Sequence, residues 1–327
     1  MLEETMQSLA AAYRLLRRTK NRTLNLADPP VIVLAYHRVT RLESDPHQLA
    51  ITPENFRGQM HYLRKNFRCL RFDEDWSGLQ GPAVVVTFDD GYADNLYQAL
   101  PIIAEAGVPA TFFISTGTLG TRMEFWSDEI EYLILGEGNR PIRFALQDEE
   151  YRHDWPATSR EERLALHRAL HSLMLKISAH RREDWLDQLR RWASLDRAGR
   201  DAYRSLTREE LQELAASPWV TIGAHGVTHT PLAVLDELGQ SQEISLSKQV
   251  LEDMLNRKID FFSYPFGGHR QYDATTRRLC RVAGFRHAVT TLPGQVHRWT
   301  DPFQLPRQMV RDWDVQTFAA RLENFWI

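Results

Sequence analysis

The chain has 327 residues, 43% of them hydrophobic and 25% charged, and its formal net charge is -3 at pH 7. This composition predicts a folded protein with a large core, in one α/β domain or two smaller ones, and the charge offers no electrostatic footprint for nucleic acid. Cys69 and Cys280 are the only cysteines, which argues against a disulfide framework and against a thiolate metal site.

We interpret residues 1–28 as an N-terminal helical extension, ahead of one α/β unit over residues 29–327. No run approaches the roughly 18 apolar residues that a membrane span needs. Within residues 1–20, acidic residues precede basic ones, the reverse of a secretory signal, so we expect a cytoplasmic protein without a membrane span. A plain helix is favoured for this segment, and weak peripheral contact with an anionic membrane is the alternative.

The first predicted elements are a strand and a helix. The apolar run Val31–Tyr36 predicts a buried strand, and His37 stands just past its end. Thr52 as a cap and Pro53 in the first turn predict the start of a helix that extends to about Lys65.

A second predicted strand, Val84–Thr87, leads into two adjacent carboxylates, Asp89 and Asp90. Gly91 permits a sharp turn where the strand stops. The carboxyl ends of such strands are where α/β folds keep their chemistry, so one carboxylate can bind a metal while the other acts as a base. The alternative is an ordinary strand followed by a turn that Asp-Gly opens.

The rest of the chain continues the alternation of strands and helices, with one interruption. The further predicted elements are a helix over 95–106, a strand over 110–114, a helix over 207–216, a strand from 220, a helix over 240–256, a strand over 261–264, a helix over 273–283 and a strand over 287–290. Residues 120–206 instead carry Leu-rich amphipathic patterns with many charges, which predict a helical insertion with a mostly solvated charged face. About seven strands predict an irregular α/β barrel, with an open doubly wound sheet as the alternative.

Two histidines four residues apart, His225 and His229, follow the strand that begins at Val220. One Asp and two His form a sufficient ligand set for a catalytic divalent ion. The neighbouring Asp would then be free to take a proton from water that the ion activates. The set therefore predicts metal-assisted hydrolysis of an amide or an ester.

Three motifs together resemble those of the polysaccharide deacetylase family, carbohydrate esterase family 4. They are Thr87-Phe88-Asp89-Asp90-Gly91, His225-Gly226-Val227-Thr228-His229 and Tyr264-Pro265-Phe266-Gly267. Tyr36-His37-Arg38-Val39 and Thr52-Pro53-Glu54-Asn55-Phe56 resemble the branch of poly-N-acetylglucosamine and exopolysaccharide deacetylases. The resemblance covers about residues 31–311 and implies a distorted (β/α)7 barrel that removes N-acetyl groups from glycans with Zn²⁺, or with a similar ion such as Co²⁺ or Ni²⁺.

The resemblance also implies a role for each site residue. The expected metal ligands are Asp90, His225 and His229. Asp89 is the expected general base and His37 the expected general acid, and Phe266 is expected to offer its backbone N–H to the oxyanion.

The sequence departs from the family pattern at several positions. Many members carry an arginine at the position of Ser263, where it pairs with the catalytic Asp. Arg307, in a Leu-Pro-Arg sequence, is the candidate substitute, with a surface or structural role as an equal alternative. His297 ranks below His37 as the acid because it falls in a predicted polar loop, and Thr230 stands where a proline usually follows the second histidine.

Two alternatives accompany the expected N-deacetylase acting on an N-acetylated glycan. The same fold and metal would serve an esterase or amidase acting on another acylated substrate. A non-catalytic carbohydrate-binding barrel is the other alternative, and it is disfavoured because the base and all three expected ligands are present.

Overall fold

The computed structural model describes residues 23–197 and 199–326. The expected helix over residues 1–20 lies outside these residues, and residues 23–27 are helical. No helix among the described residues has both the length and the apolar character to cross a membrane.

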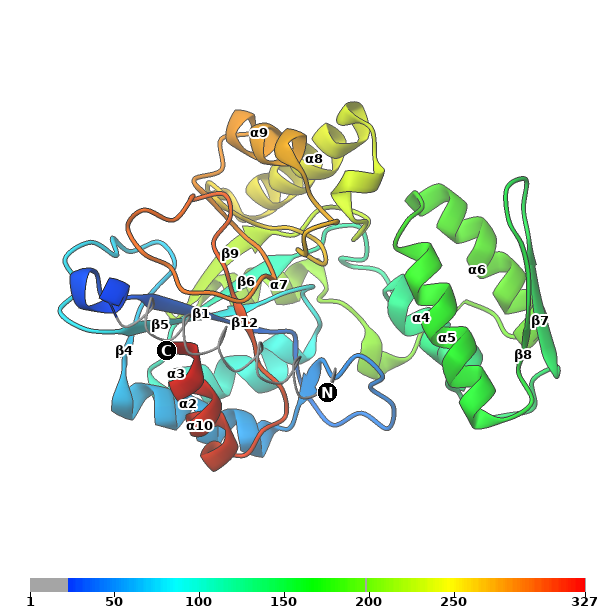
Figure 1. The fold of residues 1–327 in the computed structure, drawn as a ribbon, viewed down its shortest axis with the longest axis horizontal. Coiled ribbons are helices and arrows are strands. Elements are labelled where there is room, and N and C mark those ends of the chain that lie inside the picture. The colour runs from blue at the N-terminus through cyan, green and yellow to red at the C-terminus, as the bar shows by residue number, and fades with distance from the viewer. Residues whose placement is uncertain (1–22, 198, 327) are drawn as a thin grey trace, which may run out of the picture.

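Within the described residues, one curled sheet of mostly central, buried strands forms the middle of the molecule (Figure 1). In spatial order its strands are β11 (His287–Val289), β10 (Phe261–Ser263), β9 (Val220–Ala224), β6 (Ala110–Ile114), β5 (Ala83–Phe88), β1 (Val31–Tyr36) and β12 (Gln308–Met309), and β4 (Arg68–Cys69) pairs with β5 outside this path. All of these neighbours run parallel. The sheet forms a half-barrel surrounded by helices, which confirms the predicted barrel-like α/β fold rather than an open doubly wound sheet.

The two ends of the sheet approach each other through residues 302–309, which we call the seam. Val289 of β11 forms a parallel bridge with Leu305, and the Thr290 N–H donates to the Leu305 carbonyl at 2.9 Å. Gln308 of β12 is in register with Leu34 of β1. The seam therefore spans the gap between β11 and β1 with irregular backbone.

Helices surround the sheet, and most of them lie close to the positions that the sequence predicts, whereas the C-terminal helix Val315–Trp326 was not predicted. They are α2 (Pro53–Asn66), the π-helix η1 (Asn95–Ala99), α3 (Leu100–Ala106), α7 (Arg208–Ala216), α8 (Glu237–Leu255), α9 (Ala274–Val282) and α10 (Val315–Trp326), with 3₁₀ turns η2 (Asp201–Tyr203) and η3 (Leu232–Val234). Thr52 caps α2 as expected, since its Oγ1 accepts from the Asn55 N–H. Asp312 accepts from the N–H and the hydroxyl of Thr52, each at 2.9 Å, and so ties the C-terminal part of the chain to this cap.

The insertion forms a lobe beside the barrel, with three helices and a hairpin (Figure 1). Its elements are α4 (Trp126–Leu135), β7 (Arg143–Gln147), β8 (Arg152–Pro156), α5 (Arg160–Met174) and α6 (Ala179–Ala193). The lobe has a hydrophobic cluster of its own around Trp185 and Leu170, which are both fully buried. The sequence predicts helices only, and the antiparallel hairpin β7–β8 is missed because β8 is polar and almost wholly exposed, without an alternating apolar face.

The charges of the insertion are less solvated than the sequence predicts. Arg190 forms a bidentate pair with Glu129, and their side chains are 9% and 5% exposed. Arg200 pairs with the buried side chains of Glu124 and Glu131. Helical periodicity cannot separate such interior pairs from a charged outer face, because both place charges at the same helical spacing.

A loop at residues 40–49 crosses from the barrel toward the insertion. It connects β2 (Arg38–Val39) with β3 (Ala50–Ile51), which pair in parallel. The Tyr203 hydroxyl donates to the Ser44 carbonyl at 3.0 Å, and Arg311 donates to the His47 carbonyl at 3.1 Å. The loop is thus anchored from two separate parts of the chain.

Candidate active site

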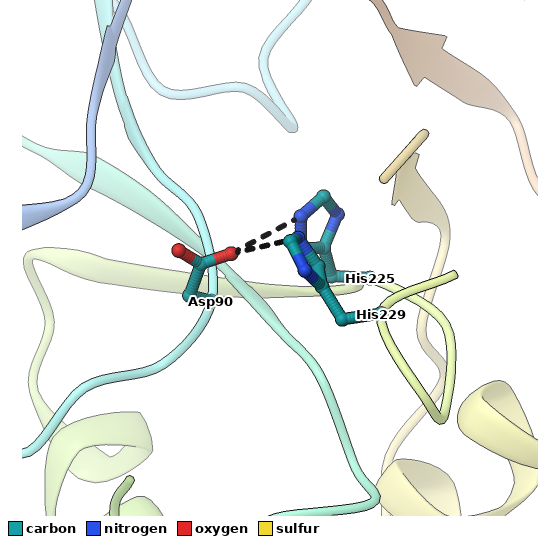
Figure 2. Close-up of side chains that lie close together, drawn as sticks. All are labelled: Asp90, His225 and His229. Atoms are coloured by element: carbon teal, nitrogen blue, oxygen red, sulfur yellow. Dashed lines mark ion pairs between the residues drawn. The ribbon is translucent and has the colours of Figure 1, made fainter. Parts of the chain in front are cut away.

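The expected ligand residues meet at the carboxyl edge of the sheet. Asp90 follows β5 and His225 follows β9, and β6 lies between these two parallel strands. Asp90, His225 and His229 each place a ligand atom within 4.8 Å of the others, and all three are buried. Figure 2 shows both imidazoles facing one carboxylate oxygen: Asp90 Oδ1 is 3.4 Å from Nε2 of His225 and 3.2 Å from Nε2 of His229.

Strained backbone is concentrated at this edge. The backbone φ angle is 77° at Asp90, 50° at His229 and 62° at Phe266, and only six non-glycine residues of the described chain have positive φ. Gly226, at φ 73°, turns the chain between the two histidines. Because a positive φ is costly for residues with a Cβ, such conformations persist where the surrounding structure enforces them, often at functional sites.

The local hydrogen bonds suit this set of residues for a divalent metal ion. His225 Nδ1 lies 2.8 Å from the Ser263 carbonyl, which only an Nδ1–H can donate to, so Nε2 is left as the free ligand atom. Asp90 Oδ1 is buried and has no hydrogen-bond partner in the described chain. A cation bound between these atoms would satisfy that oxygen. One carboxylate and two imidazoles suit Zn²⁺ and also Co²⁺ or Ni²⁺.

A buried glutamate holds the turn between the two histidines. Glu243 of α8 is 8% exposed, and its carboxylate accepts from the N–H of Val227 at 2.7 Å and from the N–H and hydroxyl of Thr228 at 3.0 and 2.7 Å. Sequence reasoning missed this residue. Its signal is helical spacing, because Glu243 shares the buried face of α8 with Gln240, Ile244, Ser247 and Leu251.

The expected base, Asp89, is bound by an arginine from the seam. Nη1 of Arg307 lies 2.7 Å from Oδ1 of Asp89, and Nη2 lies 2.6 Å from Oδ2. Ser263, at the position of the family arginine, donates to Asp89 Oδ2 at 3.1 Å. Burial raises the pKa of Asp89, but the charge and the hydrogen bonds of Arg307 are the largest opposing effect, and the pKa falls to about 2. The sequence left the role of Arg307 open, and the structure shows that it pairs with Asp89.

His37 and Phe266 lie at the same edge. His37 follows β1, which is paired with β5, and Asn95 donates to the His37 carbonyl at 2.9 Å. Burial lowers the pKa of His37, while the charges of Asp90 and Asp89 act in the opposite direction. The ring of Phe266 is 4.6 Å from that of His229, measured between centroids.

His297, the less favoured candidate acid, lies away from this edge. It is next to Val296, which bridges to Val31 at the start of β1, the opposite end of that strand from His37. Its Nδ1 is 3.1 Å from the Asp28 carbonyl, and its ring stacks on Trp299. These contacts indicate a structural role.

The insertion contacts the second histidine and the residue after it. Nε1 of Trp126 donates to the His229 carbonyl at 3.3 Å. Arg182 of α6 donates to Oγ1 of Thr230 at 2.7 Å, and both side chains are buried. Thr230 thus supplies a hydroxyl that the more usual proline lacks, and through it the insertion contacts the residue next to His229.

Comparisons with known proteins identify the family and agree with the fold. The family model described as polysaccharide deacetylase matches residues 78–150 and 170–288, and the unmatched gap lies in the insertion. A candidate polysaccharide deacetylase of Bacillus subtilis (strain 168), YxkH, is 21% identical over 286 residues, which are 85% of this chain and 70% of that protein.

Two solved structures share the fold. IcaB from Ammonifex degensii has a TM-score of 0.59 at 19% identity, and the alignment covers 91% of this chain and 98% of that chain. The Streptococcus pyogenes deacetylase PplD, solved in complex with acetate, has a TM-score of 0.57 at 16% identity, with coverages of 90% and 98%. At these identities the likeness establishes the fold alone.

Proposed function

The chain belongs to the polysaccharide deacetylase family, and we propose that it is a metal-dependent hydrolase that removes N-acetyl groups from N-acetylated glycans. The observation that carries this proposal is the convergence of three ligand residues beside a buried Asp89–Arg307 pair at one edge of the sheet. The resemblance of the early Tyr36-His37 motif to exopolysaccharide deacetylases supports a polymer of N-acetylglucosamine type as substrate.

In this proposal Asp90, His225 and His229 hold the metal ion, and His225 is oriented by the Ser263 carbonyl. When bound, such an ion supplies Lewis acidity that activates water at neutral pH. The fit rests on the donor set and on the buried Asp90 Oδ1, which forms no hydrogen bond but faces Nε2 of both histidines.

The remaining residues move protons and stabilise charge. Asp89 accepts a proton from the attacking water, and Arg307 keeps its carboxylate ionised and fixed in orientation. The backbone N–H of Phe266 donates to the oxyanion that develops on the acetyl carbonyl. His37 donates a proton to the leaving amine as the C–N bond breaks, so the products are acetate and a free amino sugar.

The test is the release of free amine from N-acetylglucosamine oligomers, with and without a chelator. We expect chelator-sensitive release by the wild type and a loss of about 10²-fold or more in Asp89→Asn, in line with the usual size of a general base effect. Asp154→Asn, an exposed position on β8, is the matched control and should retain full activity.

Two outcomes would contradict the proposal. Release of acetate only from an ester or a small amide, with about one metal ion bound per chain, would assign the same site to another acylated substrate. No hydrolysis together with no metal binding would indicate a non-catalytic carbohydrate-binding barrel.

A further inference from the structure

Three histidines form a second cluster where the barrel meets the insertion. His47 lies in the loop 40–49, and His167 and His171 lie one turn apart on α5. The ring centroid of His47 is 4.4 Å from that of His171 and 5.3 Å from that of His167, and the two α5 rings are 6.3 Å apart. Neither the family motifs nor the proposed mechanism uses these side chains.

Two of these imidazoles contain buried nitrogen atoms without a partner. Nε2 of His47 and Nε2 of His167 are buried and form no hydrogen bond in the described chain, and His167 as a whole is 1% exposed. Buried polar atoms are normally hydrogen-bonded, so each exception calls for an explanation such as an ion. An ion bound by both nitrogens would account for both exceptions at once.

The protonation state of the cluster suits ligands. Burial is the largest effect on all three rings: it lowers the pKa of His47, that of His167 to about 4 and that of His171 to about 3. All three are therefore neutral at pH 7, and the neutral imidazole is the form that binds a metal. The carboxylates of Asp45 and Glu131 raise the pKa of His47, while the nearby cations Arg311 and Arg168 lower those of His47 and His167.

We propose that His47, His167 and His171 form a second site for a divalent transition metal ion, which fastens the loop 40–49 to α5. Three imidazoles favour Zn²⁺, Ni²⁺ or Cu²⁺ over the oxygen-seeking Mg²⁺ and Ca²⁺. An i, i+4 pair on one helix with a third histidine from another segment matches the three-ligand composition of known zinc sites.

Binding one ion at all three side chains requires their rings to turn. Among the described residues, only Asp90, His225 and His229 already place one ligand atom each within 4.8 Å of one another. The ring centroids of His225 and His229 are 5.0 Å apart, within the range of 4.4 to 6.3 Å that the second cluster spans. Turning the rings of His47 and His167 breaks no hydrogen bond at Nε2, because neither atom has one.

The second cluster is separate from the active site but adjacent to it. The His171 ring stacks on Trp126 at 5.1 Å and lies 6.2 Å from the Phe266 ring. Trp126 in turn binds the His229 carbonyl. An ion in the second cluster would therefore fix the wall that Trp126 and Phe266 form beside the first site.

The test is the zinc content of the full chain after saturation with Zn²⁺ and removal of free metal. We expect about two zinc ions per chain in the wild type, and about one in His167→Gln and in His225→Gln, which remove one site each. The exposed His153→Gln of β8 is the matched control and should keep both ions. His47→Gln, in the loop rather than on a helix, repeats the test if His167→Gln does not fold by circular dichroism.

The two single variants separate this inference from the proposed function. Zinc content that falls with His225→Gln but is unchanged by both His167→Gln and His47→Gln would overturn the second site and leave the first. A fall with His167→Gln but none with His225→Gln would support the second site and count against the first. The thermal midpoint should follow the same pattern, with added Zn²⁺ still raising it in His225→Gln and no longer in the His47→Gln/His225→Gln double variant.

Discussion

Arg307 is a fully buried cation whose hydrogen-bonding capacity is completely used. Besides its bonds to Asp89, its Nε donates to the Thr290 carbonyl at 2.9 Å, and its other two N–H groups reach the hydroxyls of Thr87 and Ser263 at 3.2 and 3.0 Å. Five donors thus meet five acceptors. A buried ion pair is tolerated when every donor and lone pair is satisfied in this way, but removing one partner leaves an uncompensated charge.

We therefore expect Arg307→Met to lower the free energy of unfolding by about 3 to 5 kcal/mol and to abolish deacetylation. Urea denaturation at neutral pH measures the stability change. Arg143→Met is the matched control, because Arg143 also binds an aspartate, Asp154, with two nitrogens, yet both side chains are more than half exposed. Equal effects of the two substitutions would contradict the argument.

A second substitution tests the position of the charge rather than its loss. Ser263 occupies the position at which many family members carry the arginine, and its hydroxyl touches both Asp89 and Arg307. Adding Ser263→Arg to Arg307→Met should restore part of the lost activity. No recovery in a folded double variant would show that the base needs its cation from the seam.

At the scale of residues, the sequence predicts those site residues that belong to recognisable motifs. Asp90, His225 and His229 converge as expected, because a strand end and a tight turn leave each side chain little freedom. Arg307 was named as one candidate for the missing arginine, but the choice between this role and a structural one stayed open, because its partner lies 218 residues away and nothing local records the pairing. Glu243 was missed because the sequence of a helix does not show whether a glutamate on it faces solvent or a neighbouring turn.

Among the elements, α8 anchors the turn between the two histidines. The carboxylate of Glu243 accepts hydrogen bonds from three donors on Val227 and Thr228, which lie between the two proposed metal ligands. The turn contains Gly226 and carries strain at His229, so without this anchor it has other conformations available.

We expect Glu243→Ala to weaken zinc binding at the first site by about 10- to 100-fold, the usual cost of losing a residue that orients metal ligands. Competition with a zinc chelator measures the affinity, in a His167→Gln background so that the proposed second site does not contribute. Gln242→Ala, at the exposed neighbouring position on α8, should leave the affinity unchanged. An unchanged affinity in Glu243→Ala would mean that the turn is held by its own backbone.

Element boundaries followed the sequence at some capping residues, although α8 begins after Asp236, three residues before the predicted start. α7 begins after Thr207 with the expected capping box, and α9 begins after Asp273. The hairpin β7–β8 had no such signal. Its stability comes from packing of Phe144 and Leu146 against the insertion core, which is a tertiary effect.

For the whole molecule, the order of strands and helices predicted the barrel but not how it closes. We propose that the insertion is a separate folding unit at about residues 120–206, because it has its own hydrophobic cluster. The closure of the barrel, by contrast, depends on the seam and on α10. Phe318 and Leu322 of α10 are fully buried, and the ring of Phe318 lies 6.0 Å from that of Tyr62 on α2.

We expect Phe318→Ala to lower the free energy of unfolding of the barrel by about 3 to 5 kcal/mol, the usual cost of removing a buried aromatic side chain. The rate of deacetylation per folded molecule should not change, because α10 contributes none of the site residues. Denaturant unfolding and activity below the transition measure the two quantities. Val315→Ala, at a 39% exposed position on the same helix, is the control, and a fall in the rate constant for Phe318→Ala would link α10 to the site.

Because Arg307 lies in the seam, the ribosome makes it long after Asp89, and this affects when the site can form. Asp89 leaves the ribosome 218 residues before its partner, an interval of roughly 10 to 40 s at ordinary synthesis rates. During that time β5 and β6 can pair, but the carboxylate of Asp89 has no cation with which to be buried. We therefore expect the nascent barrel to stay open at this edge until Arg307 has been made, so that the step that closes the fold also completes the proposed catalytic base.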